Sequence, residues 1–134
     1  MVFTNGVFDI LHVGHVDLLR KAKAFGDVLV VGLNSDASVR RLKGPSRPIN
    51  SQRDRAEILL SLSMVDAVCV FGEDTPLELI RALQPDVLVK GAEYSVAKIV
   101  GADDVKSAGG IVRRVKMKPG YSTTGTIRRA ARRK

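Results

Sequence analysis

Apolar residues occur along the chain in short, nearly continuous runs that alternate with segments of helical spacing. The runs cover residues 1–4, 28–33, 66–71, 86–90 and 111–117, and we interpret them as strands. The first four are almost entirely apolar, which is typical of parallel strands that are buried on both faces of a sheet.

The segments between these runs have apolar residues at the spacing of amphipathic helices. They cover residues 16–25, 53–62 and 76–83, with a weaker candidate at 102–109. Gly26 is expected to cap the first helix, and Pro76 stands in the first turn of the third. The alternation predicts an α/β fold: a single Rossmann-like domain over residues 1–134, whose five-stranded parallel sheet carries helices on both faces.

The longest loop-like segment is KGPSRPIN, residues 43–50, which is rich in Gly, Pro and Ser. Loops of this kind in compact domains are often functional, so we expect it to act as a lid. Ligands of parallel α/β folds bind beyond the carboxyl ends of the strands, which is where such a lid would lie.

Length and composition restrict the class of protein. The chain has 134 residues, 45% of them hydrophobic, which suits one globular domain. No run approaches the ~18 apolar residues of a membrane span, and no signal-peptide pattern opens the chain, so we expect a cytoplasmic protein without membrane contact. Cys69 is the only cysteine, which excludes an intramolecular disulfide, and we expect its thiol to be buried and inert.

The formal net charge of +8 raises the question of polyanionic partners. Much of this excess lies in the last seven residues, which include Arg128, Arg129, Arg132, Arg133 and Lys134. We interpret these side chains as the solvated face of a last helix. Aromatic residues make up only 4% of the chain, too few for the stacking surface of a single-strand binder. Nucleic acid is therefore not the expected partner.

Both histidines of the chain, His12 and His15, stand where the first strand gives way to the first helix. Their spacing of three places them on one face of the first helical turn. Asn5 and Gly6 follow the strand, and Gly14 opens the helix, where backbone N–H groups and the helix dipole attract phosphate. Neither GxGxxG nor GxxxxGK[ST] is present. Phosphate binding is the favoured interpretation over a purely structural role, and a zinc site lacks a third ligand.

The segment TNGVFDILHVGH resembles the HxGH signature of the small nucleotidyltransferases, which include cytidylyltransferases, pantetheine-phosphate adenylyltransferase and ADP-heptose synthases. NSDASVRRLKG, RPIN with the following Arg55, DVLVKGAEY and GYSTT occur in the order of the heptose 1-phosphate adenylyltransferase domain of ADP-heptose synthase. The resemblance covers essentially the whole chain.

The resemblance assigns roles to the first half of the chain. The residues implied in catalysis are His12, His15, Lys43 and Arg55, and those implied in nucleotide binding are Thr4, Asn5, Gly6, Val7, Phe8, Asp9 and Gly14. The histidines would hold the triphosphate, and Asp9 would hold the turn instead of acting as a base. Lys43 would meet the phosphates, with an exposed loop lysine as the alternative. Arg55 would bind the substrate phosphate, although Arg53 could take that role.

In the second half, the resemblance implies nucleotide contacts from Lys90, Gly91, Glu93, Gly120, Tyr121, Ser122, Thr123 and Thr124. Glu93 stands at a family position that is often aspartate and meets the nucleoside. The three hydroxyl residues make chemical sense at a helix N-terminus, which an anion can share, and a plain helix cap is the alternative.

Met117 occupies the place where cytidylyltransferases for glycerol phosphate carry an arginine, which favours ATP over CTP. We therefore expect transfer of AMP from ATP to a sugar 1-phosphate, D-glycero-β-D-manno-heptose 1-phosphate by resemblance, giving ADP-heptose and pyrophosphate. Mg²⁺ would be held mainly by phosphates and water, without a protein metal cage. A separate sugar kinase would supply the acceptor, and a homodimer is left open. Alternatives are glycerol-3-phosphate cytidylyltransferase, an FAD synthetase-like enzyme and a nucleotide- or RNA-binding module.

Overall fold

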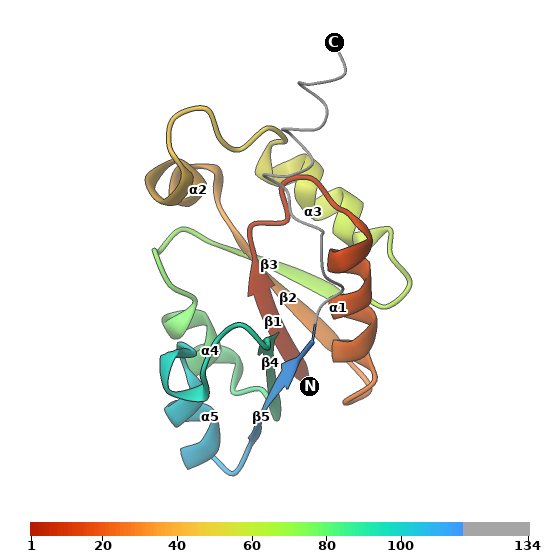
Figure 1. The fold of residues 1–134 in the computed structure, drawn as a ribbon, viewed down its shortest axis with the longest axis vertical. Coiled ribbons are helices and arrows are strands. Elements are labelled where there is room, and N and C mark those ends of the chain that lie inside the picture. Colours follow the sequence, from red (N-terminus) through yellow and green to blue (C-terminus); the bar gives the residue numbers. More distant parts are fainter. Residues whose placement is uncertain (117–134) are drawn as a thin grey trace.

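The computed structural model describes residues 1–116, which fold around one parallel sheet (Figure 1). Its strands are β1 (Val2–Gly6), β2 (Leu29–Asn34), β3 (Ala67–Phe71), β4 (Val87–Gly91) and β5 (Ile111–Val115). They lie in the order β3-β2-β1-β4-β5, and every neighbouring pair is parallel. The predicted five-stranded parallel sheet is confirmed. The expected Rossmann-like arrangement follows, because the chain order reverses on either side of β1.

The helices are α1 (Val13–Lys23), α2 (Asp36–Lys43), α3 (Gln52–Leu60), α4 (Leu77–Leu83) and α5 (Ala102–Ser107), with a short 3₁₀ helix at Val96–Lys98. Helices α1 and α3 cover one face of the sheet, and α4 and α5 cover the other (Figure 1). Within residues 1–116, none of these helices is long and apolar enough to cross a membrane.

Alternate residues of the central strand feed two separate parts of the core. Val2 packs with Leu19 and Leu59 beneath α1 and α3, whereas Phe3 packs with Ile80 and other residues beneath α4 and α5. Successive side chains of a strand point to opposite faces, so a strand covered on both sides needs an unbroken apolar run. This is why the run at the start of the chain correctly predicted a doubly covered sheet.

Three local expectations differ from the structure. Helix α1 begins at Val13 instead of at residue 16. It ends with a C-cap at Ala24 in the right-handed conformation, so Gly26 is not its cap. Instead, a Cβ on Gly26 would lie 2.8 Å from Val2 Cγ2, so this glycine permits close packing. Cys69 is half-buried instead of buried, because β3 is an edge strand.

The helix at residues 36–43 is not predicted by the spacing of apolar residues. Helix α2 begins after Ser35, whose hydroxyl accepts a hydrogen bond from the Ser38 N–H. Its eight residues bury only Ser38 and Val39, and Leu42 is half exposed. The apolar stripe is therefore too narrow for residue spacing to predict a helix here. The N-cap residue Ser35 is the one sequence feature that indicates the helix start.

Candidate active site

The sheet parts at its carboxyl edge between β1 and β4. These strands are paired only at Val2 with Val87 and at Phe3 with Leu88. One residue further along, the Thr4 hydroxyl donates a 2.9 Å hydrogen bond to the Val89 carbonyl. Asn5 and Gly6, which were expected to follow the strand, are its last two residues and border the gap. The parting coincides with the point where the strand order reverses, which is where such folds bind ligands.

Three adjoining cavities open at this gap, with volumes of about 200, 330 and 140 Å³. All three are lined by Asn5, Lys90 and Tyr94. The first also contacts His15 and Glu93, so we call it the histidine-side cavity. The second reaches Lys43 at the end of α2, so we call it the α2-side cavity.

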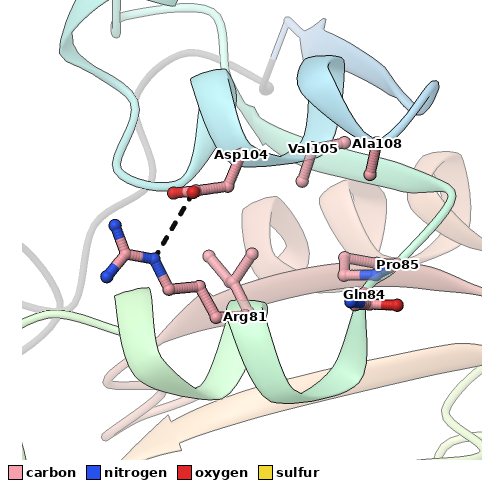
Figure 2. Close-up of a pocket in the computed structure, with 7 residues that line it drawn as sticks. Arg81, Gln84, Pro85, Asp104, Val105 and Ala108 are labelled. Carbon is pink, nitrogen blue, oxygen red and sulfur yellow. Dashed lines mark hydrogen bonds and ion pairs between the residues drawn. The ribbon is translucent and has the colours of Figure 1, made fainter.

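A further cavity of about 180 Å³ lies between α4 and α5, where Arg81 and Asp104 form a 3.4 Å ion pair (Figure 2). Its lining includes Gln84 and Pro85, which precede β4 and thus stand at the amino edge of the sheet. It shares no lining residue with the three cavities at the carboxyl edge. The candidate site therefore lies elsewhere.

The turn that follows β1 has a constrained backbone. Phe8 adopts a left-handed conformation with φ of +48°, which is costly for a residue with a bulky side chain. Its ring lies over Gly6, where a Cβ would come within 2.8 Å of the ring. The same ring meets His15 edge to face, with the ring centroids 5.3 Å apart. The unusual conformation thus places an aromatic support beneath one of the two histidines.

The two histidines form a reciprocal cap at the N-terminus of α1. His12 Nδ1 accepts a hydrogen bond from the Gly14 N–H at 3.1 Å, and His15 Nδ1 accepts one from the His12 N–H at 3.2 Å. The rings stack with their centroids 3.8 Å apart. A nitrogen that accepts a hydrogen bond carries no proton, so each neutral ring carries its proton on Nε2. The Nε2–H of His15, whose ring lines the histidine-side cavity, is therefore a potential donor to an anion.

The protonation state of His15 follows from its surroundings. Burial, and next the neighbouring His12, lower the pKa of His15 to about 4. The ring is consequently neutral near pH 7, and its Nε2–H would be an uncharged donor to a ligand. The spacing of the two histidines in the sequence predicts a shared face, and the two rings do lie together at the start of α1.

Asp9 ties the turn to the loop at residues 43–50. Its buried carboxylate accepts hydrogen bonds from the N–H groups of Ile49 and Asn50 and from Arg47 Nε at 2.9 Å. Burial by itself raises the pKa of Asp9, but the two backbone hydrogen bonds and Arg47 outweigh it and lower the pKa overall. All these partners stabilise the ionised form, so Asp9 functions here as an anchor for the loop.

Arg55 has a different position from the one expected of a residue that contacts a substrate phosphate. Its side chain is fully buried. The guanidinium donates hydrogen bonds to the carbonyls of Val7, Asn34 and Asn50 and forms a 2.8 Å ion pair with Asp36. A guanidinium enclosed in this way presents no donor to a ligand. In this structure Arg55 joins β1, β2 and the start of α2, while Arg53 is exposed on α3.

Lys43 is the last residue of α2, and it lines the α2-side cavity together with Val7 and Lys90. Gly44 caps the helix with φ of +104°, a conformation that favours glycine. The structure thus places Lys43 beside the same gap as the histidine turn, although the two segments are thirty residues apart in the chain.

The end of β4 supplies the opposite wall of the gap. Lys90 Nζ lies 5.0 Å from the centroid of the Tyr94 ring, and burial lowers the pKa of Lys90 while the nearby Glu93 raises it. The Glu93 carboxylate folds back over Gly91, since a Cβ there would lie 2.3 Å from Glu93 Oε2. These residues of the predicted set therefore share one wall.

Sequence reasoning missed several residues that line the gap. The structure adds Asn34, Phe71, Asp74 and Tyr94. Asn34 and Phe71 each end a strand, so their place at the carboxyl edge was the available signal. Gly120, Tyr121, Ser122, Thr123 and Thr124 lie outside the residues that the structure describes.

Comparison with known proteins gives a consistent assignment. A family model described as cytidylyltransferase-like matches residues 3–129. The bifunctional protein HldE of Mesorhizobium japonicum is 65% identical over 125 residues, which are 93% of this chain and 25% of that protein. HldE of Campylobacter curvus is 60% identical over 129 residues, 96% of this chain and 27% of that protein. The chain thus spans about a quarter of the length of these relatives.

Among solved structures, the crystal structure of a lipopolysaccharide core biosynthesis protein from Thermoplasma volcanium is similar, with a TM-score of 0.70 and 31% sequence identity. The match covers 87% of this chain and 97% of that one. The resemblance seen in the HxGH segment is confirmed at the level of the family. The chain belongs to the cytidylyltransferase-like family.

Proposed function

We propose that this chain transfers AMP from ATP to a heptose 1-phosphate, giving ADP-heptose and pyrophosphate. The observation that carries the proposal is the His15 ring near the start of α1: its Nδ1 accepts a hydrogen bond, so its Nε2–H is the remaining donor, and the ring lines the cavity at the gap in the sheet. The family match and the similarity to HldE proteins support the reaction class and the acceptor.

In this reaction an oxygen of the acceptor phosphate attacks the α-phosphorus of ATP. The bond between the α- and β-phosphates breaks, and its electrons leave with pyrophosphate. Extra negative charge develops on the oxygens around the α-phosphorus, so fixed donors that face these oxygens lower the barrier. The neutral His15 ring would provide one such donor, and the N-terminus of α1 adds the positive end of its dipole.

The remaining groups around the gap have charges that suit two anionic substrates. Lys43 and Lys90 bring positive charge to the α2-side cavity. Asp9 holds the loop at residues 43–50, and Arg55 holds the turn after β1. Holding both substrates in a fixed geometry supplies much of the rate enhancement of a direct displacement, so these anchors would act through positioning.

Mg²⁺ is the expected metal of the reaction, and it would enter with the triphosphate. Among residues 1–116, no three His, Cys, Asp or Glu side chains gather where they could hold a metal ion. Among residues 1–116, the carboxylates that line the three cavities are Glu93 and Asp74, which line different cavities; an ion that keeps its waters and binds phosphate oxygens would suit this arrangement. When bound, Mg²⁺ would neutralise charge on the departing pyrophosphate.

A sugar kinase would supply the 1-phosphate acceptor. The expectation that this kinase is a separate chain stays a prediction, since the present chain matches only about a quarter of each HldE relative. The preference for ATP also stays a prediction, because Met117 lies outside the described residues.

The proposal is tested by a screen for pyrophosphate release. ATP and CTP are each combined with heptose 1-phosphate, glycerol 3-phosphate and FMN in the presence of Mg²⁺. We expect ATP with heptose 1-phosphate to give the largest kcat/KM, by at least about tenfold over CTP. Release with CTP and glycerol 3-phosphate, or with ATP and FMN, would assign another branch of the family. No release with any pair, together with tight RNA binding, would favour a binding module.

A further inference from the structure

Lys90 occupies the boundary between the two larger cavities at the carboxyl edge of the sheet. Four residues line both cavities: Asn5, Gly6, Lys90 and Tyr94. Among these four, only Lys90 has a side chain that is charged near neutral pH. On one side of it lies the histidine-side cavity of about 200 Å³, and on the other lies the α2-side cavity of about 330 Å³.

The position of Lys90 follows from the parting of the sheet. β4 pairs with β5 as far as Gly91, and Lys90 is opposite Arg114 in that register. On its other side β4 has already separated from β1, whose last paired residue is Phe3. Lys90 lines both cavities beside this gap, and its backbone is held by the pairing with β5.

The surroundings of Lys90 leave its charge only partly compensated. Burial lowers the pKa of Lys90, and Glu93 raises it through its negative charge. The ion pairs within 4.0 Å among residues 1–116 do not include Lys90. The Tyr94 ring, 5.0 Å from Nζ, contributes a cation–π contact on one side. An anion that enters either cavity would therefore improve the environment of this ammonium group.

Two anionic substrates repel each other when their phosphate groups are brought together for reaction. The attacking oxygen of one phosphate must approach the phosphorus of another to about 3–3.5 Å. Repulsion between their charges grows as water leaves the site, because the effective dielectric constant falls. A cation at the boundary interacts with both anions at once, which reduces the penalty for binding the second in the presence of the first.

We propose that Lys90 is a shared phosphate contact, placed between the nucleotide in the histidine-side cavity and the sugar phosphate in the α2-side cavity, and that it couples the binding of the two. This inference rests on the proposed function and adds to it a residue that allows both substrates to be bound together. Lys43, which lines only the α2-side cavity, would contact one substrate alone.

The test compares binding of each substrate alone with binding in the presence of the other. Calorimetry uses α,β-methylene-ATP, in which the bond that would break cannot be cleaved, and a sugar 1-phosphate acceptor. In the wild-type protein we expect each substrate to bind at least as tightly when the other is present. In Lys90→Met, each substrate should weaken the other by about tenfold, and the factor should be the same in both directions because coupling is reciprocal.

Matched variants distinguish a loss of coupling between the two substrates from a loss of folding and from a general loss of attraction for anions. Lys106→Met removes an exposed ammonium on α5, away from the gap, and should leave the coupling unchanged. Lys90→Arg keeps the charge and should retain most of the coupling. Lys90→Gln serves as a second uncharged variant if Lys90→Met does not give a cooperative thermal melt.

The outcomes distinguish the two proposals. Failure of the wild-type protein to bind either substrate would overturn the proposed function. If the wild type binds both but each already weakens the other, the role of Lys90 is overturned and the function stands. The same holds if the uncharged variants weaken each substrate equally whether the other is present or absent, because Lys90 would then attract anions without coupling them.

Discussion

His12 and His15 cap the first helix together: the backbone N–H of His12 donates to the ring of His15, and the His12 ring accepts from the backbone N–H of Gly14. Both Nδ1 atoms are engaged in this way, so the arrangement fixes which nitrogen of each ring carries the proton. One stacked pair of side chains thus caps the start of the helix, and its His15 ring lines the gap between β1 and β4.

This double role predicts that capping and catalysis can be separated at His12. Asparagine is a favourable N-cap, so His12→Asn should keep the helix start while it removes the Nε2–H donor. We expect a rate loss on the order of a hundredfold, as for other fixed donors to a transition state. The melting temperature should stay near that of the wild type. Steady-state kinetics and a thermal melt measure the two effects.

His12→Ala is the companion variant, because it removes the cap as well as the donor. We expect the same loss of rate and an additional loss of about 1 kcal/mol in the free energy of unfolding. Turnover close to that of the wild type in both variants would show that the ring is only a helix cap.

The lowered pKa of His15 predicts how stability depends on pH. The unfolded chain binds a proton at His15 near pH 6.5, whereas the folded protein resists it until about pH 4. Between these values the unfolded state binds more protons, so the contribution of His15 to stability is complete above pH 6.5 and is lost as the pH falls toward 4. NMR titration of the His15 ring should give a midpoint near 4. A midpoint near 6.5 would contradict the burial described here.

The contacts of Asp9 predict that the loop at residues 43–50 depends on one carboxylate. Asp9→Asn replaces an acceptor of several hydrogen bonds by an amide and leaves Arg47 without its ion-pair partner. We expect a loss of about 3 kcal/mol in the free energy of unfolding, because removing one partner of a buried ion pair leaves the other charge buried without compensation.

Urea denaturation measures the effect of Asp9→Asn, and Glu57→Gln makes the same chemical change on an exposed residue of α3. Because the pKa of Asp9 is lowered in the folded protein, its contribution should be present above the ordinary value of 3.8 and fade as the pH falls below it. A loss no greater than that of the control would show that the loop is held by other contacts.

Arg55→Lys tests whether the guanidinium organises the turn. The ammonium group of lysine cannot donate in the same geometry to the three carbonyls and the carboxylate that the planar guanidinium contacts. We therefore expect the free energy of unfolding to fall by about 2–3 kcal/mol and kcat/KM to fall with it. Arg53→Lys, two residues earlier and exposed, should change stability by less than about 0.5 kcal/mol. Unchanged stability in Arg55→Lys, with weaker binding of the acceptor alone, would instead support a direct contact with substrate phosphate.

The contrast between Arg55 and the strands shows what a single sequence can reveal. Strands such as β1 and β2 were predictable because a doubly covered strand is apolar over most of its length. Burial of a charged side chain has no such signature: Arg55 follows an exposed Arg53, and only the three-dimensional meeting of β1, β2 and α2 supplies its partners. The histidine spacing predicted a shared face but not the mutual hydrogen bonds, which depend on the backbone of the turn.

The central strand β1 changes character along its length. Val2 and Phe3 are completely buried in the two halves of the core, and three residues later Gly6 borders an open cavity. The same strand thus contributes both to the core and to the lining of the histidine-side cavity, and no hinge separates the two parts. New ligand preferences would therefore arise from α2, the 43–50 loop and the residues after β4, which can change while this shared strand remains as it is.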